Sequence, residues 1–104
     1  MTEVKEEHYS CGNIWRISYG INGKYHREDG PACICYYKDG SIQFKEYWIN
    51  GKRHREDGPA YIGYHPNGNI EYKYYYIYGT HLNENEWYKQ LSLKNKIKLA
   101  FNEY

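Results

Sequence analysis

Two four-residue clusters hold the side chains most able to do chemistry. Residues 26–29 and 54–57 both read HRED, so each cluster places a histidine, an arginine and two carboxylates side by side. Histidine can act as a general base, and carboxylates can hold a metal ion. Each cluster continues directly into Gly-Pro, however, and Asp-Gly-Pro is typical of a turn that leads into a strand. The same residues therefore fit either a reactive site or a structural turn.

The spacing of the two clusters favours the turn. Residues 22–32 read NGKYHREDGPA and residues 50–60 read NGKRHREDGPA, at an offset of 28. A catalytic site needs one asymmetric arrangement, whereas a structural contact recurs in every unit of a repeat. We therefore predict no catalytic site and no enzyme activity, and expect each arginine to bridge the Glu of the neighbouring unit. The predicted turn residues are His26, Arg27, Asp29, Gly30, His54, Arg55, Asp57 and Gly58.

The repeat organises most of the chain. Residues 12–39 and 40–67 are identical at 16 of 28 positions, and a shorter, divergent copy follows over 68–83. A polar leader, 1–11, precedes the first copy, and a segment of different character, 84–104, follows the last. We expect all 104 residues to form a single domain, because a chain of this length rarely holds more.

Each unit is expected to contribute antiparallel strands. In the second copy, 42–49 is β-branched and aromatic and ends at Asn-Gly, and 60–65 alternates before Pro-Asn-Gly. The equivalents 14–21, 32–37 and 70–77 predict a mainly β fold, an antiparallel meander of about five strands in stacked hairpins. Apolar residues of opposite parity within each long strand predict a bulge near its middle and a single curved sheet.

The segment 84–104 has helical spacing. Asn83 or Asn85 can cap its start. Its apolar residues form two stripes, which are Trp87 and Leu91, and then Leu93, Ile97, Ala100, Phe101 and Tyr104. Because one straight helix would split these stripes, we predict two short helices broken near Ser92, which form a helical cap over the open end of the sheet.

Aromatic side chains are the strongest candidate for a binding surface. At the offset of 28, Trp48 aligns with Tyr76 and Phe44 aligns with Tyr72, and alternation places Tyr74 on the same face. These rings are either core beneath the terminal helices or, where the face is uncovered, a docking surface for a protein. We predict Trp48, Tyr72, Tyr74 and Tyr76 as binding residues.

Charge and hydropathy exclude several functional classes. The chain has 14 basic and 13 acidic side chains, a net charge of +1, which argues against a protein dedicated to specific nucleic-acid binding. It contains no run of 18 apolar residues, so we expect no membrane span. Its polar start does not resemble a secretory signal. No glycine-rich phosphate loop or nucleophile elbow is present, and we expect no cofactor.

The cysteines favour a reducing compartment. Cys33 and Cys35 would face the same way on one strand, a poor geometry for a mutual bridge. With Cys11 they also fail to match the usual spacing of a zinc site, so we predict no metal. We interpret all three as free thiols of a cytoplasmic protein.

The stretch WINGKRHREDGPAYIGYHPNG, residues 48–68, resembles a MORN-type repeat. Trp48, Gly51 and His54 match the W/Y-x-x-G-x-x-H core of that family, and Gly68 matches its turn glycine. The insertion of REDGP lengthens the period to 28, as in variant repeats of viral, phage and mobile-element proteins. The resemblance implies stacked hairpins, and family members include membrane-associated scaffolds, protein-interaction modules, and immunity or antitoxin proteins.

Together these features predict a non-enzymatic module that binds a partner protein. The resemblance implies an inhibitor of a host defence protein from a phage or virus, acting in the host cytoplasm, or an immunity or antitoxin protein; a homo-oligomer is also compatible. The alternative is a protein that sequesters a small, nucleotide-like ligand. Such a ligand would lie between the rings and one of the arginines Arg16, Arg27, Arg53 or Arg55.

Overall fold

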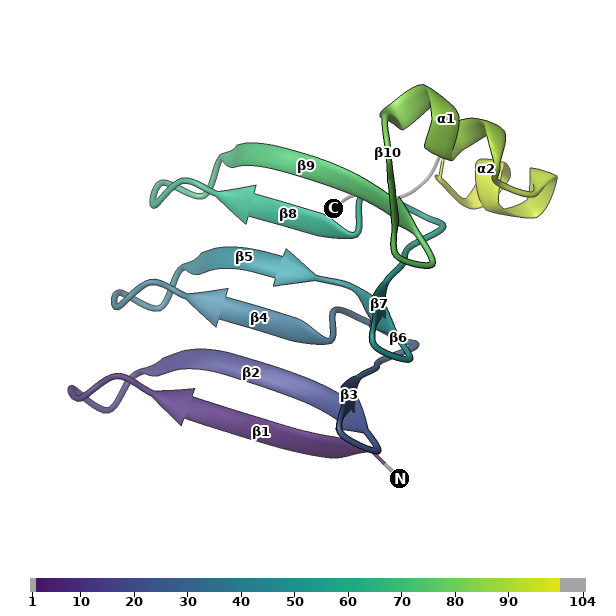
Figure 1. The fold of residues 1–104 in the computed structure, drawn as a ribbon. Helices are drawn as coiled ribbons and strands as arrows, with labels where there is room; N and C mark the ends of the chain where they lie inside the picture. The colour runs from purple at the N-terminus through teal and green to yellow at the C-terminus, as the bar shows by residue number, and fades with distance from the viewer. Residues whose placement is uncertain (1, 100–104) are drawn as a thin grey trace.

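The computed structural model describes residues 2–99 and is mainly β (Figure 1). Its strands are β1 (Glu3–His8), β2 (Ile14–Ile21), β3 (Lys24–Tyr25), β4 (Cys33–Tyr36), β5 (Ile42–Glu46), β6 (Trp48–Ile49), β7 (Lys52–Arg53), β8 (Tyr61–Tyr64), β9 (Ile70–Ile77) and β10 (Thr80–Leu82). Its helices are α1 (Glu84–Lys89) and α2 (Leu93–Leu99).

Most of the strands form one antiparallel sheet. Within the described residues this sheet has eight strands, in the order β1-β2-β4-β5-β8-β9-β10, with β3 paired to β2, and β6 and β7 form a separate two-stranded sheet. Figure 1 shows three pairs of long strands stacked above one another, with the short strands β3, β6, β7 and β10 at one end. The antiparallel β fold is confirmed, whereas the prediction of about five strands in a single sheet is wrong.

The segment predicted as a polar leader contains β1. This strand pairs with β2, where Lys5 lies opposite Ser18 and Glu7 lies opposite Arg16. Its charged residues show no apolar alternation, so the sequence did not suggest a strand. A strand at the edge of a sheet can form without such a pattern. Charges along an exposed edge also oppose pairing with another chain.

The other additional strands come from tight turns. Asn22, Asn50 and Tyr78 have φ values of 52°, 48° and 42°, and each is followed by a glycine with positive φ. Two successive positive φ values are typical of the type I′ turn, which joins the strands of a two-residue hairpin. Each Asn-Gly or Tyr-Gly pair therefore opens a short hairpin, where the sequence pattern had suggested only the end of a strand.

A bulge lies near the start of each long strand. In the pairing of β8 with β9, Gly63 lies opposite Tyr72 and Tyr64 lies opposite Ile70, which leaves Glu71 as the extra residue. The same register shift occurs between β4 and β5 and between β1 and β2. The bulge moves the first isoleucine of each strand to the other face of the sheet. The predicted bulge therefore exists, but it lies at the second residue of the strand and not near the middle.

The two-helix arrangement of the C-terminal segment is confirmed. The Asn83 side chain accepts a hydrogen bond from the Glu86 amide, and the Glu86 side chain accepts one from the Asn83 amide. This reciprocal capping box begins α1. The chain then breaks at Ser92 before α2. Neither helix within residues 2–99 is long and apolar enough to cross a membrane.

Among the described side chains, the apolar contacts predicted for the cap come from α1 and from Leu91, which follows it. Trp87 is 1% exposed and packs on Tyr75, and Leu91 completes this small core. Leu93 and Ile97 of the second predicted stripe are instead exposed. Its remaining members, Ala100, Phe101 and Tyr104, lie outside the described residues.

Candidate binding surface

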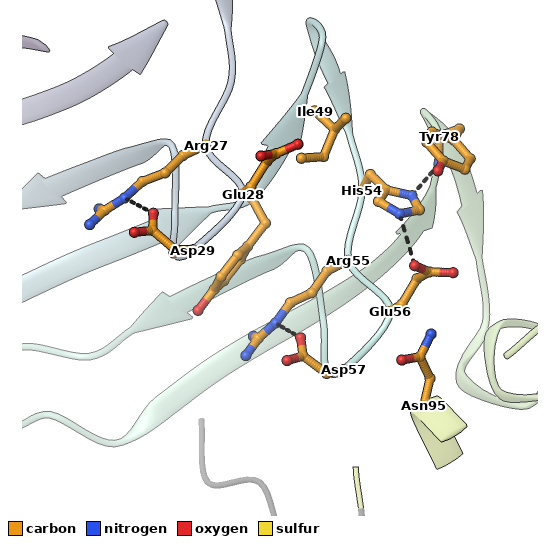
Figure 2. Close-up of a pocket in the computed structure, with 12 residues that line it drawn as sticks. Arg27, Glu28, Asp29, Ile49, His54, Arg55, Glu56, Asp57, Tyr78 and Asn95 are labelled. Carbon is orange, nitrogen blue, oxygen red and sulfur yellow. Dashed lines mark hydrogen bonds and ion pairs between the residues drawn. The ribbon is translucent and has the colours of Figure 1, made fainter. Parts of the chain in front are cut away.

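The HRED loops, residues 26–31 and 54–59, are held together by their arginines. The Arg55 guanidinium lies 3.9 Å from the centre of the Tyr47 ring, and its Nε donates a hydrogen bond to Asp57 Oδ1 at 2.8 Å. The first loop repeats these contacts through Arg27, Tyr19 and Asp29. The ion pair thus closes within each loop (Figure 2). The predicted bridge to the Glu of the neighbouring unit is wrong, because the Asp-Gly-Pro turn brings the aspartate back to its own arginine.

The histidines join each HRED loop to the hairpin of the next unit. His54 Nδ1 accepts a hydrogen bond from the Tyr78 amide at 2.9 Å, and the two rings stack with their centres 3.8 Å apart (Figure 2). His26 Nδ1 accepts the equivalent bond from the Asn50 amide at 2.9 Å. Both donors are the first residue of a type I′ turn. The histidines therefore hold these turns in place, which is a structural contact.

Acidification is expected to weaken the contact that His54 makes. Burial lowers the pKa of His54 below its ordinary 6.5, although Glu56, at 3.7 Å, opposes the shift. The unfolded chain therefore takes up the proton first, and the free energy of unfolding should fall as the pH drops below 6.5. Urea unfolding between about pH 7.5 and pH 5.5 measures this. His54→Gln should show a shallower decline, and an equal decline in both proteins would contradict the assignment.

Gly30 and Gly58 provide space for the guanidinium groups. Neither residue is among the glycines with positive φ. A Cβ at Gly58 would lie 2.8 Å from Arg55 Cζ, and one at Gly30 would lie 3.1 Å from Arg27 Cζ. These two turn positions therefore favour glycine because the arginine approaches the backbone closely, and not because the backbone has a positive φ.

A cavity of about 530 Å³ lies between the two HRED loops (Figure 2). Its charged groups include Arg27 with Asp29 and Arg55 with Asp57, which already pair with each other. No three His, Cys, Asp or Glu side chains among the described residues are arranged to hold a metal ion. The side chains that looked most reactive in the sequence are thus engaged in holding the loops.

Arg53 is the centre of a cluster of rings on the face of the sheet. Its Nη2 and Nε lie 2.8 and 2.9 Å from Glu46 Oε2. Its Cζ lies 5.1, 5.7 and 5.4 Å from the ring centres of Trp48, Tyr61 and Tyr76. Cation–π attraction and a partly buried ion pair therefore fix the guanidinium and the rings around it.

From Tyr61 the rings continue to the edge of the sheet. The Tyr61 ring centre lies 5.4 Å from that of Phe44, 6.1 Å from that of Tyr72 and 5.7 Å from that of Tyr74. A groove of about 390 Å³ runs among these tyrosines, Tyr76 and Arg53. We call this region the aromatic surface, and its members are Phe44, Trp48, Arg53, Tyr61, Tyr72, Tyr74 and Tyr76.

All four predicted binding residues belong to the aromatic surface. Tyr72 and Tyr74 are 43% and 41% exposed, whereas Trp48 and Tyr76 are half-buried around Arg53. The helix α1 packs on Tyr75, which strand alternation places on the opposite face of β9. Within residues 2–99, the core beneath α1 is therefore formed by Tyr75 and not by these four rings.

One member of the aromatic surface, Tyr61, and two residues that contact its members, Glu46 and His81, were not predicted as binding residues from the sequence. Tyr61 lies directly opposite Tyr74, a register that the Pro-Asn-Gly turn between the strands could have indicated. Glu46 is a single acidic residue in a strand rich in apolar residues. Such a residue indicates that its carboxylate pairs with a basic side chain. His81, whose ring stacks on Tyr76 with centres 5.0 Å apart, belongs to a strand that the pattern did not suggest.

Two of the cysteines lie beside the aromatic surface, with Cys35 opposite Phe44 and Cys33 opposite Glu46. Cys33 and Cys35 are buried and free on one strand, and Cys11 is free and exposed. The hydrogen bond between the two buried thiols raises the pKa of Cys33 and lowers that of Cys35. Because burial limits access, the two thiols act as small side chains of the sheet.

Comparisons of the chain with models of protein families, with curated proteins and with solved structures found no match.

Proposed function

We propose that this protein is a non-enzymatic interaction module that binds a partner protein through the aromatic surface. The observation that carries the proposal is the exposure of Tyr72 and Tyr74 on a face that α1 does not cover. Rigid tyrosine rings lose little conformational freedom on binding and are favoured at protein interfaces. The protein would thus present a preformed surface.

The arrangement around Arg53 supports a preformed surface. The half-buried Trp48 and Tyr76 rings are held against one guanidinium, and the exposed rings pack on Tyr61. Burial raises the pKa of Tyr61 to about 12, so its hydroxyl keeps its proton and can donate a hydrogen bond. Rings held in this way need little reorganisation when a partner docks.

The biological setting that we propose comes from the resemblance to MORN-type repeats of viral, phage and mobile-element proteins. In that setting the chain is a stack of hairpin repeats with a C-terminal helical cap. Its partner is a host defence protein that it inhibits, or a toxin that it neutralises, in the cytoplasm.

A second candidate function is the binding of a small, nucleotide-like ligand. The groove of about 390 Å³ among Arg53 and the tyrosines favours it, since rings can stack on a base and a guanidinium can bind phosphate. Arg53 is already paired with Glu46, however, and an anion would have to compete with that carboxylate. We therefore rank a protein partner first.

Tyr74→Ala is expected to weaken partner binding by about 2 kcal/mol, roughly thirtyfold, while the fold survives. The partner is first captured on the tagged wild-type protein and identified by mass spectrometry, and its affinity for each variant is then measured by calorimetry. Tyr88→Ala is the matched control, because Tyr88 is 45% exposed but lies on α1. Tyr76→Ala and Trp48→Ala should also weaken binding, with some loss of stability because both rings contact Arg53.

Two results would contradict the proposal. One is capture of a metabolite in place of a stoichiometric protein, which would select the second candidate function. The other is loss of binding in His54→Ala, with the fold intact, when Tyr74→Ala has no effect. The HRED loops would then be the functional site, and not the structural contacts that His54 makes with the Tyr78 turn.

A further inference from the structure

The outer edge of β1 has no partner strand within residues 2–99. β1 stands at one end of the strand order of the main sheet and pairs with β2 on one side only. Figure 1 shows it as the outermost strand of the stack, at the end opposite to α1. All residues of β1 except Glu7 are exposed. This edge is therefore accessible to another chain.

The repeat shows which strands cover the equivalent edges. Residues 5–7 of β1 precede residues 33–35 of β4 and 61–63 of β8 by one and two repeats of 28 residues. Residues 33–35 pair with 16–18 of β2, and residues 61–63 pair with 44–46 of β5. β1 thus has the same place in its unit as β4 and β8, but it lacks the strand that covers them.

The outward backbone groups of β1 follow from the same equivalence. The Ala60 carbonyl accepts a hydrogen bond from the Tyr47 amide, and the equivalent bond recurs one unit earlier. Val4 is the corresponding residue of β1, so its carbonyl points outward. Because every second residue of a strand directs its backbone groups to the same side, the N–H and C=O of Glu6 also point outward.

The charges of β1 match those of the strand that covers β8. β5 carries Lys45 and Glu46, which lie opposite residues 62 and 61 of β8. A strand placed on β1 in the same register would bring a lysine opposite Glu6 and a glutamate opposite Lys5. Both are cross-strand pairs of opposite charge, which stabilise an antiparallel pairing. A strand with the charge order of β5 is therefore complementary to β1.

The charges of β1 now make only weak contacts. Lys5 Nζ lies 3.9 Å from Glu7 Oε1, and Glu6 Oε2 lies 3.6 Å from His8 Nε2. The side chains of Lys5 and Glu6 are 74% and 54% exposed, and ion pairs of this kind contribute little. Charges on an edge oppose pairing with most strands, including a second β1 with its excess of acidic residues. They thereby select a strand whose charges are opposite at the matching positions.

Val4 marks the place of an aromatic side chain in the added strand. It is 59% exposed, although it is the apolar residue of a charged strand. A cavity of about 470 Å³ lies beside it, and Tyr19 and Ile21 contribute to its lining. In the register of β5, the residue opposite Val4 corresponds to Tyr47. A ring at this position would cover Val4 and fill part of the cavity.

We propose that the outer edge of β1 binds an extended segment of a second protein as an additional antiparallel strand. The segment has the order basic-acidic-aromatic, opposite Glu6, Lys5 and Val4. The proposal goes beyond the proposed function, because β1 lies at the opposite end of the strand order from β9 and its exposed tyrosines. A second copy of the chain fits less well, since its β5 is already paired on both sides.

The peptide SIQFKEYWI, residues 41–49, is the probe. It contains β5 and the tyrosine that follows it, so it has the lysine, the glutamate and the ring in the required order. The peptide SIQFEKYWI, in which the lysine and the glutamate are exchanged, should bind about tenfold more weakly. The two peptides have the same composition, so non-specific adsorption does not distinguish them. Amide chemical shifts of the protein follow both titrations.

Glu6→Lys tests the register. It places like charges opposite each other and should weaken binding of SIQFKEYWI about tenfold. The peptide SIQFEEYWI, with glutamate in place of the lysine, should instead bind Glu6→Lys more tightly than it binds the wild-type protein. Glu71→Lys is the matched control, because Glu71 is also exposed and its replacement changes the net charge equally, but it lies on β9. This control should bind SIQFKEYWI as the wild-type protein does.

Glu6→Pro tests the backbone pairing. It removes one outward N–H, which proline tolerates at a sheet edge, and should weaken binding of SIQFKEYWI about tenfold or more. Glu6→Ala keeps the N–H and loses only the ion pair, so its effect should be smaller. Circular dichroism and the melting temperature verify the fold of both variants. If Glu6→Pro does not fold, hydrogen exchange of the wild-type complex decides, because the Glu6 amide should become protected.

The outcomes separate this proposal from the proposed function. Absence of peptide binding, equal binding of SIQFKEYWI and SIQFEKYWI, or binding without protection of the Glu6 amide overturns strand addition and leaves the aromatic surface untouched. Peptide binding that is lost in Tyr74→Ala but unchanged in Glu6→Pro places the peptide on the aromatic surface, which also overturns it. A wild-type protein that sediments as an oligomer, and as a monomer with Glu6→Pro, would show that a second copy occupies the edge, with the same consequence.

Discussion

Trp87→Ala is expected to lower the free energy of unfolding by about 3 to 5 kcal/mol. The indole is 1% exposed and lies 4.7 Å, between ring centres, from Tyr75. Its Nε1 also donates a hydrogen bond to the Arg55 carbonyl at 2.8 Å. Alanine would therefore leave a cavity and remove the hydrogen bond that joins α1 to the second HRED loop. The total free energy of unfolding of a domain is only about 5 to 15 kcal/mol, so the loss is large.

Equilibrium unfolding in urea measures the effect of Trp87→Ala. Tyr88→Ala is the control, because this neighbouring ring is exposed and its loss should change stability by less than about 0.5 kcal/mol. Trp87→Phe separates the two contributions, since it keeps most of the apolar volume but removes the hydrogen bond, and should cost about 1 to 2 kcal/mol. Equal stability of Trp87→Ala and Tyr88→Ala would show that α1 contributes little to the fold.

Gly58→Val is expected to cost about 2 to 3 kcal/mol by displacing the Arg55 guanidinium. The new Cβ would lie 2.8 Å from Arg55 Cζ. The guanidinium cannot move away without leaving the Tyr47 ring and the Asp57 carboxylate. Its side chain is only 10% exposed, so water does not fully replace these contacts.

Two variants test whether the effect of Gly58→Val passes through Arg55. Gly30→Val is the matched control in the first loop, where Arg27 is 26% exposed and its partner Asp29 is 87% exposed, so the loss should be smaller. In Arg55→Ala the guanidinium is already absent, and adding Gly58→Val should then cost little more. Full additivity of the two substitutions would contradict this mechanism and would point to backbone strain at Gly58.

The local sequence determined much of the fold. The Asn-Gly and Asp-Gly-Pro turns predicted the approximate positions of β2, β4, β5, β8 and β9, but not β1, because these turn residues favour particular backbone conformations wherever they stand. Asn83 and the two apolar stripes likewise predicted two helices with a break at Ser92. Alternation along β9 brought the predicted binding residues Tyr72, Tyr74 and Tyr76 to one surface. These features depend on residues close together in the chain.

The number and pairing of strands depended on the tertiary structure. Residues 3–8 have no apolar alternation, and they become a strand because β2 offers a backbone edge to pair with. Tyr78 adopts a positive φ without being Asn or Gly, since the His54 imidazole accepts its amide hydrogen bond from another unit. Backbone pairing partners of this kind come from distant parts of the chain, and a local pattern does not identify them.

The candidate surface could be predicted only in part from the sequence, and the tertiary structure decided the rest. The sequence by itself supplied the rings and their parity, and it indicated that the two identical HRED clusters form structural turns. Only the tertiary structure decided that α1 covers Tyr75 and leaves Tyr72 and Tyr74 exposed, and that Arg53 reaches Glu46 across the sheet. The physical reason is that burial and charge pairing depend on which elements meet in space, whereas backbone preference and alternation depend on neighbours in the chain.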